Sequence, residues 1–324
     1  MTPPATNTLP LRRDHFALAA ELSARFTAES LVRVDEPLAK RTTLRVGGPA
    51  DLLVEPASEA DLAATLRFCT EQGLPHCLIG RGSNLLVRDG GVRGAVISLG
   101  HLSFAQLTVE GERLHCGAGL KLKHIANEAR RHALAGLEFL EGIPGSLGGA
   151  LRMNAGAMGG WLFDVVESVR FMDPSGAVHE RDRAAIEVSY RCCPLLCAHV
   201  ALGAVLHGTP GDRTAIEERM SGYNLKRWAS QPAASSAGCI FKNPAAIPAG
   251  RLIDELGLKG TRVGGAKVSL EHGNFIVNDG GATSADVLAL IEVVRRRALV
   301  ERGIALATEV EIIGEDAGAT AKSA

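Results

Sequence analysis

The density of glycine between residues 142 and 157 constrains the fold of this chain more than any other feature. The segment holds five glycines and four Ala or Ser residues, and a glycine inside a helix or strand costs about 0.5–1 kcal/mol relative to Ala. The run therefore predicts a loop rather than the interior of a helix or strand. Such a loop is expected where missing side chains leave room for a flat or charged ligand, with a plain glycine-rich hairpin as the alternative.

Another glycine loop, earlier in the chain, follows a predicted strand at residues 76–79; it is called the first glycine loop below, and residues 142–157 the second. Gly80 and Gly82 let the backbone turn tightly and expose its N–H groups to an anion. Ser83 and Asn84 add side-chain donors. The loop has neither the helical continuation of a Rossmann fingerprint nor the Gly-Lys-Ser/Thr of a P-loop. A tight turn is the alternative for this loop alone, but two such loops in one chain favour a ligand of dinucleotide size.

The segment 236–244 combines a small-residue turn with Cys239, Lys242 and Asn243. A thiol with an ordinary pKa of about 8.5 is mostly protonated at neutral pH and can still donate its proton. Lys242 offers an ammonium group to an anionic part of a substrate. For a lone cysteine, burial in a loop before a strand is the commoner arrangement, so the two glycine loops decide in favour of a functional segment.

Composition excludes several classes of protein. The net charge of −1 gives no field for nucleic acid or a membrane surface, and aromatic residues at 4% are too few for base-stacking platforms. The seven cysteines show no paired zinc spacing, which predicts reduced thiols in a cytoplasmic protein and no metal centre. No stretch approaches the ~20 apolar residues of a membrane helix, and a signal peptide is not expected.

The patterns of helix and strand predict an α+β protein with more than one domain. Helices are predicted at residues 14–26, 58–73, 120–133, 212–225, 249–256 and 283–301. Strands are predicted at residues 51–55, 76–79, 92–99, 113–116, 166–172, 200–207, 275–277 and 309–313. Residues 228–232 are predicted to form a linker, and the small polar segment 315–324 a disordered tail.

Several longer motifs occur in a fixed order along the chain. They occupy residues 42–50, 80–85, 142–150, 153–157, 190–191, 237–244, 272–278 and 309–310. Through these motifs the chain, from about Leu38 to Gly314, resembles the UDP-N-acetylenolpyruvoylglucosamine reductases, the MurB family of flavin enzymes in peptidoglycan precursor synthesis. Several long motifs in the order of the family make a chance match very improbable.

The resemblance implies an FAD-binding domain of the vanillyl-alcohol-oxidase (PCMH) type with two subdomains, followed by a C-terminal α+β substrate-binding domain. It gives a lead-in at residues 1–40, the FAD domain at 41–210 and the substrate domain at 211–314. FAD is expected to bind without a covalent link, since the Gly80 loop contains no histidine. The residues expected to contact FAD are Thr43, Gly80, Arg81, Gly82, Ser83, Asn84, Leu85, Gly142, Ile143, Pro144, Gly145, Ser146, Gly149, Ala150, Asn154, Ala155 and Gly156.

The resemblance also implies a reaction. NADPH would reduce FAD, and hydride from the flavin would add to the enolpyruvyl methylene of UDP-N-acetylglucosamine enolpyruvate to give UDP-N-acetylmuramate. Arg191 and Glu309 would stabilise the negative charge that develops beside the carboxylate, and Cys239, where the family usually has serine, would protonate the α carbon. The expected substrate contacts are Tyr190, Arg191, Lys242 and Asn243.

Two other functions remain open on the sequence: an FAD-dependent oxidase of the same fold class, and a nucleotide-binding protein without turnover. The expected partners are the UDP-sugar substrate and NADPH, with no nucleic acid, no membrane insertion and no obligatory protein partner. No site for a 2′-phosphate is recognisable, so the sequence does not decide between NADPH and NADH.

Overall fold

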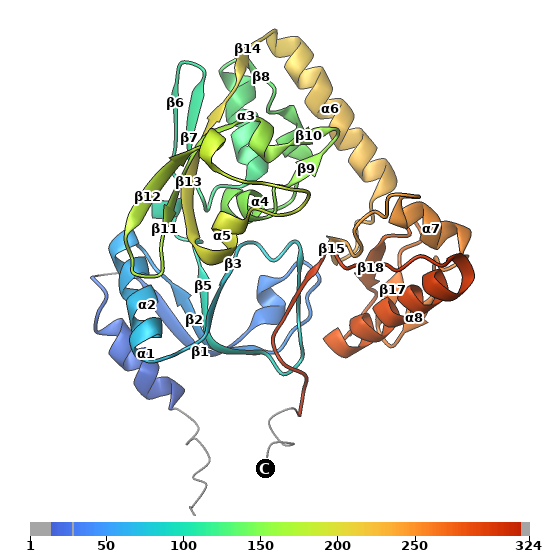
Figure 1. The fold of residues 1–324 in the computed structure, drawn as a ribbon, viewed down its shortest axis with the longest axis horizontal. Coiled ribbons are helices and arrows are strands. Elements are labelled where there is room, and N and C mark those ends of the chain that lie inside the picture. Colours follow the sequence, from blue (N-terminus) through green and yellow to red (C-terminus); the bar gives the residue numbers. More distant parts are fainter. Residues whose placement is uncertain (1–13, 28, 319–324) are drawn as a thin grey trace, which may run out of the picture.

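The computed structural model describes residues 14–27 and 29–318. In this part of the chain, three sheets of four or five strands, each with its own helices, form an N-terminal, a middle and a C-terminal lobe (Figure 1). Helices and sheets are mixed without regular alternation, so the α+β expectation is confirmed. The strands predicted at 76–79, 166–172 and 200–207 have the predicted bounds.

The N-terminal lobe is built on a sheet of strand order β1-β2-β5-β3. Its elements are α1 (His15–Ser23), β1 (Leu31–Pro37), β2 (Pro49–Glu55), α2 (Glu59–Glu71), β3 (His76–Ile79) and β5 (Val92–Ser98). Strand β2 is buried on both faces: Leu52 and Val54 pack under the two helices, and Leu53 packs on the opposite face. Ser58 is the N-cap of helix α2, and its hydroxyl accepts the N–H of Asp61 at 3.1 Å.

The middle lobe is built on an antiparallel sheet of strand order β12-β11-β13-β7-β6. Its main elements are β6 (Leu107–Glu110), β7 (Arg113–Gly117), α3 (Leu122–Arg131), α4 (Leu147–Arg152), β11 (Val166–Met172), β12 (Val178–Asp182), α5 (Pro194–Ala198) and β13 (Val200–His207). Short pieces complete it: η3 (Glu138–Gly142), β8 (Leu134–Ala135), β9 (Gly156–Ala157), β10 (Gly160–Trp161), η4 (Leu162–Asp164) and β14 (Thr209–Pro210). Helices α3 and α4 share one hydrophobic core with the sheet.

The prediction that residues 142–157 contain no helix interior was wrong, because α4 includes Gly148 and Gly149. The helix lies so close to the segment after β7 that a Cβ on Gly148 would come within 3.1 Å of the Ala118 Cβ. The N–H of Gly148 donates to the carbonyl of Ala118 at 2.8 Å. Here the absence of a side chain permits a tertiary contact that outweighs the poor helix propensity of glycine.

The linker predicted at 228–232 was also wrong at its start. Helix α6 (Arg213–Ser230) leads from the middle lobe to the C-terminal lobe and continues through Ser230 (Figure 1). No proline interrupts it before Gln231, which is extended because it precedes Pro232.

The C-terminal lobe has a sheet of order β15-β18-β17-β16 packed against two helices. Its elements are β15 (Ser236–Cys239), α7 (Ala249–Glu255), β16 (Arg262–Val263), β17 (Ala266–Val268), β18 (Phe275–Asn278) and α8 (Ser284–Arg302). The chain then returns to the N-terminal lobe, where β19 (Glu311–Ile313) pairs in parallel with β4 (Leu85–Val87). The strand that follows the first glycine loop is thereby joined to the end of the chain.

The predicted tail begins with ordered contacts. Glu315 exchanges backbone hydrogen bonds with Gly90 and Gly91, at 2.8 and 2.9 Å, and Asp316 pairs with Arg88 at 2.5 Å. Residues 319–324 of that prediction lie outside the described residues, as do residues 1–13 of the predicted lead-in. The described part of the lead-in supplies α1, β1 and the 3₁₀ turn η1 (Leu38–Arg41). Two further 3₁₀ turns are η2 (Leu102–Phe104) and η5 (Arg183–Ala185).

Candidate active site

A cleft of about 1360 Å³ opens where the lobes meet. The first glycine loop, the second glycine loop and the segment 231–236 after α6 all contribute to its wall. Basic side chains from separate elements line it too, among them Arg41, Lys121 and Arg227. No sequence motif singles out these three, because isolated basic residues on different elements form no recognisable pattern.

The two glycine loops face one another in the cleft. The hydroxyl of Ser83 in the first loop donates to the carbonyl of Pro144 in the second at 3.0 Å. A Cβ on Gly80 would come within 2.9 Å of the Ser146 hydroxyl, so the absence of a side chain lets the two loops approach without moving that hydroxyl. Gly149 also lines the cleft, and a Cβ there would meet no atom within 4 Å. The loops thus form one surface with bare backbone towards the cleft.

The residues predicted to contact FAD fall into two groups. Those that line the cleft are Thr43, Gly80, Arg81, Ser83, Leu85, Pro144, Ser146 and Gly149. Those that the structure places outside its lining are Gly82, Asn84, Gly142, Ile143, Gly145, Ala150, Asn154, Ala155 and Gly156. In the second group Gly82 has φ 62°, and a Cβ on it would lie 2.2 Å from the carbonyl oxygen of Arg41. Its glycine is explained by this backbone contact.

Two asparagines of the second group hold other parts of the site. The amide of Asn84 donates to the main-chain carbonyl of Glu309 at 3.1 Å. The amide of Asn154 donates to the carbonyl of Ser189 at 3.3 Å, and its oxygen accepts the N–H of Phe163 at 3.3 Å. Asn84 therefore fixes the backbone of one residue predicted to be catalytic, and Asn154 fixes the turn that carries another, Arg191.

Arg191 and Glu309 meet, although they are far apart in the sequence. The Nε of Arg191 donates to Oε1 of Glu309 at 2.7 Å, and both side chains are mostly buried. Arg191 sits in a tight turn in which Ser189 and Cys192 exchange backbone hydrogen bonds of 2.9 and 3.2 Å. Its φ of 57° is left-handed, which is uncommon for a residue with a side chain and is often found at functional sites.

Cys239 lies beside this pair. Burial raises the pKa of its thiol to about 11; the charge of Glu309 adds to the rise, while Arg191 and a hydrogen bond from Asn274 oppose it. Asn274 also bonds the N–H and carbonyl of Phe241 at 2.9 and 2.8 Å, so it fixes the backbone after the thiol. The thiol of Cys239 is therefore neutral at pH 7 in the folded protein.

The predicted substrate residues surround this group unevenly. The hydroxyl of Tyr190 lies 3.3 Å from Oε2 of Glu309 and accepts a hydrogen bond from the backbone of Asn243, and burial raises its pKa. The side-chain oxygen of Asn243 accepts the N–H of Ala249 at 3.0 Å, which places it at the start of α7. Lys242 is exposed.

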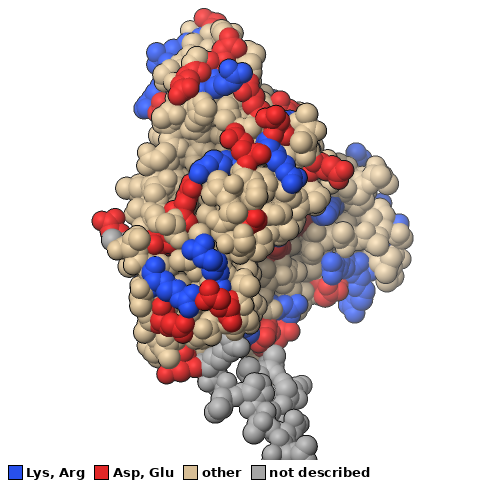
Figure 2. Space-filling model, turned by 60° about the vertical axis from the view of Figure 1, so that its left-hand side comes forward, with Lys and Arg blue, Asp and Glu red and all other residues tan. Residues whose placement is uncertain are grey.

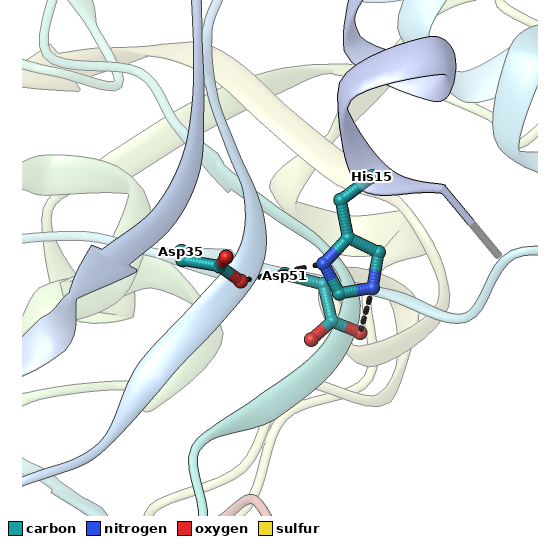
Figure 3. A group of neighbouring side chains, drawn as sticks. All are labelled: His15, Asp35 and Asp51. Carbon is teal, nitrogen blue, oxygen red and sulfur yellow. Dashed lines mark hydrogen bonds and ion pairs between the residues drawn. The ribbon is translucent and has the colours of Figure 1, made fainter. Parts of the chain in front are cut away.

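A cluster of His15, Asp35 and Asp51 has side-chain ligand atoms within 4.8 Å of one another. Figure 3 shows the imidazole between the two carboxylates, with Nδ1 3.3 Å from Asp35 and Nε2 3.7 Å from Asp51. The two ring nitrogens point to different carboxylates, and Asp51 already pairs with Arg93 at 2.8 Å. This arrangement joins α1 to strands β1 and β2 and is not that of a metal centre.

One face of the molecule shows the balanced charge of the sequence. On the face drawn in Figure 2, basic and acidic side chains are interspersed. Among the described residues, no helix is both long and apolar enough to cross a membrane.

Comparisons with known proteins agree over nearly the whole chain. A family model described as UDP-N-acetylenolpyruvoylglucosamine reductase, C-terminal domain, matches residues 231–313, and a model described as FAD binding domain matches residues 50–182. A UDP-N-acetylenolpyruvoylglucosamine reductase of Geobacter metallireducens is 46% identical to this chain over 91% of it and 99% of the relative. One of Clostridium botulinum is 42% identical, over 88% and 93% respectively.

A solved structure gives the same result. The crystal structure of the UDP-N-acetylenolpyruvylglucosamine reductase (MurB) from Thermus caldophilus is similar with a TM-score of 0.77 and 38% identity. The match covers 88% of this chain and 99% of that structure. Both glycine loops lie inside the FAD-binding match, and both Cys239 and Glu309 lie inside the C-terminal match.

Proposed function

The chain belongs to the UDP-N-acetylenolpyruvoylglucosamine reductase family and is an FAD-binding oxidoreductase of peptidoglycan precursor synthesis, and we propose that it works as follows. NADPH is the electron donor, UDP-N-acetylglucosamine enolpyruvate is the acceptor, and UDP-N-acetylmuramate is the product. The observation that carries the residue assignments is the meeting of Arg191, Glu309 and Cys239 at the junction of the lobes. The reaction takes place in the cytoplasm, in keeping with seven free cysteines.

The cleft suits FAD. Its bare glycine backbone at Gly80 and Gly149 lets a ligand approach closely, and Arg81 and Lys121 bring positive charge for a pyrophosphate. These residues, with Thr43 and the other predicted contacts that line the cleft, would hold the cofactor. FAD, when bound, supplies the hydride. The nine predicted contacts outside the lining then act through the shape of the loops.

Arg191 binds the carboxylate of the enolpyruvyl group. Its Nε is already engaged by Glu309, so the two terminal nitrogens of the guanidinium remain for the substrate. A planar fork of permanent positive charge suits a carboxylate and also the negative charge that spreads onto it as the methylene carbon accepts hydride. Glu309 fixes the direction of the fork.

Cys239 protonates the α carbon. A proton donor in this step must be neutral when it is needed, and the raised pKa of the thiol keeps it so at pH 7. Lys242 is exposed and offers its ammonium group to an anionic part of the UDP-sugar. Tyr190, held between Glu309 and the backbone of Asn243, presents its ring beside Arg191 for contact with the substrate.

An anaerobic experiment tests the function as a whole. The purified holoprotein is reduced with NADPH until its visible flavin absorbance disappears, and the enolpyruvyl substrate is then added. We expect reoxidation of the flavin with one UDP-N-acetylmuramate formed per flavin. A colourless protein that takes up no added FAD would contradict the cofactor assignment. A reduced flavin that reacts rapidly with oxygen but not with the substrate would point to the oxidase instead.

A further inference from the structure

We propose that Trp161 is a positioning residue of this enzyme, which acts through Arg191 in the step that consumes the enolpyruvyl substrate. The inference rests on the proposed role of Arg191 and extends it to a residue that no sequence motif singled out. Trp161 ends strand β10 and is half-buried, at the edge of the second glycine segment.

The indole of Trp161 is held in place by its own hairpin. A Cβ on Gly156, across the β9–β10 hairpin, would lie 2.5 Å from Cε3 of the indole, so only glycine fits there. The backbone N–H of Trp161 donates to the carboxylate of Asp164 at 3.0 Å, which fixes the main chain at the base of the ring. Gly156 was predicted to contact FAD, but its missing side chain makes room for this ring.

The indole in turn contacts Arg191. The Cζ of Arg191 lies 5.2 Å from the centre of the Trp161 ring and 5.2 Å from the centre of the Tyr190 ring. The two rings meet edge to face, with centroids 5.6 Å apart and an angle of 74°. Tryptophan is the strongest cation–π partner of a guanidinium. The two aromatic rings and the hydrogen bond to Glu309 therefore jointly fix the position of the guanidinium.

This enclosure matters because an arginine side chain has many rotamers. A guanidinium held only through Nε could turn its terminal nitrogens away from the substrate, whereas the two rings restrict it. We expect loss of the indole to slow hydride transfer to the substrate about tenfold, with little effect on the reduction of the flavin by NADPH. Trp161 is not proposed to touch the substrate.

The first experiment compares the two half-reactions by anaerobic stopped flow in the holoprotein variants Trp161→Leu, Trp161→Phe and Phe163→Leu. Phe163 is the matched control, because its ring stacks on a different arginine, Arg183, at 5.4 Å in the same segment. Trp161→Leu should slow only reoxidation by the substrate, Trp161→Phe should recover part of the rate, and Phe163→Leu should not show this selectivity. Equal slowing of both half-reactions in Trp161→Leu would overturn the inference.

A double-mutant comparison separates the inference from the proposed function. In an Arg191→Ala background, Trp161→Leu should have no further effect on reoxidation, because its route of action is gone. A full additional tenfold loss would mean that Trp161 acts without Arg191. If Arg191→Ala itself left reoxidation unchanged, the proposed role of Arg191 would fail. A normal rate in Trp161→Leu with a slow Arg191→Ala would refute only the inference.

A spectroscopic readout does not depend on turnover. The chain has two tryptophans, so Trp228→Phe leaves Trp161 as the sole source of indole fluorescence. In that background Arg191→Ala should shift the emission of Trp161, while Arg183→Ala, which removes the arginine on Phe163, should not. An unchanged spectrum in Arg191→Ala would show that the guanidinium does not contact the indole.

Discussion

The raised pKa of Cys239 predicts an unusual alkaline limit for product formation. A rise from 9.0 to about 11 means that the neutral thiol persists to higher pH in the folded protein than in a free cysteine. At pH 9 about 1% of this thiol is ionised, against about half of a thiol whose pKa stays at 9.0. The proton-donor form is therefore complete at neutral pH and is lost as the pH rises through about 11.

The rise in the pKa of Cys239 corresponds to about 3 kcal/mol of extra free energy for ionising the thiol. Burial is the main cause, and the negative charge of Glu309 adds to it. Glu309→Gln should therefore move the alkaline limit downward, while the effect of burial stays. This gives the prediction a direction that depends on a named neighbour of the thiol.

The assay is single-turnover reoxidation of the NADPH-reduced flavin by the substrate, with the enzyme kept at neutral pH and jumped to the test pH in the stopped-flow mixer. The rate should be flat up to about pH 10 and fall near pH 11. Cys239→Ser should remain active and lose this fall in rate at high pH (the alkaline limb), because a serine hydroxyl stays neutral. Cys239→Ala should be reduced by NADPH but form product about 10²–10⁴-fold more slowly.

Two controls make the result specific. Tyr190 has a raised pKa and lies in the same group, so Tyr190→Phe tests whether its hydroxyl causes the limb. Cys69→Ala removes another buried thiol, whose pKa is also raised to about 11 but which lies on the buried face of α2 in the core of the N-terminal lobe. The alkaline limb of the pH–rate profile should be the same in Cys69→Ala as in the wild type. A limb at about pH 9 or below, a limb that survives in Cys239→Ser, or wild-type product formation by Cys239→Ala would refute the reasoning.

Three further outcomes follow from contacts in the site. Glu309→Gln should slow reoxidation by the substrate about 10²–10³-fold, and equal slowing of flavin reduction would mean that Glu309 supports the fold instead. Asn84→Ala, which removes the amide on the Glu309 carbonyl, should slow the same half-reaction without loss of bound flavin; a colourless variant would assign Asn84 to the cofactor. Gly156→Ala should lower the free energy of unfolding in urea by about 1–3 kcal/mol, whereas Gly142→Ala, whose nearest atom would be 3.8 Å away, should change it little; equal losses would contradict the packing argument.

The sequence predicted regular elements best where local signals agree. Strand β13 was predicted with its bounds because a run of apolar and β-branched residues stands between polar ends, and α8 because Thr283 and Asp286 form a capping box at its start. The family and the cofactor could be predicted because the motifs are long and ordered. The meeting of Arg191 and Glu309 was implied by the resemblance alone, since nothing local links two residues so distant in the chain.

The sequence could not predict features that depend on tertiary contact. Gly148 has the pattern of a helix breaker until Ala118 is known to lie against it. Asn84 has the pattern of a phosphate contact in a glycine loop, but its amide reaches Glu309. Trp161 carries no local sign of its contact with Arg191, because that contact depends on how the hairpin packs. In each case the partner residue comes from a distant segment.

Glu309 is bonded through its backbone to two lobes at once. Its N–H donates to the carbonyl of Ile240 in the C-terminal lobe at 2.8 Å, while its carbonyl accepts the amide of Asn84 in the N-terminal lobe at 3.1 Å. A recombinant hybrid that took residues 211–314 from a relative would therefore replace strand β19, the partner of β4, along with Glu309. Hybrids joined at residue 306 keep the native strand β19 as the partner of β4, so they should assemble more readily. In such hybrids the new lobe must still supply a carbonyl that accepts the N–H of Glu309.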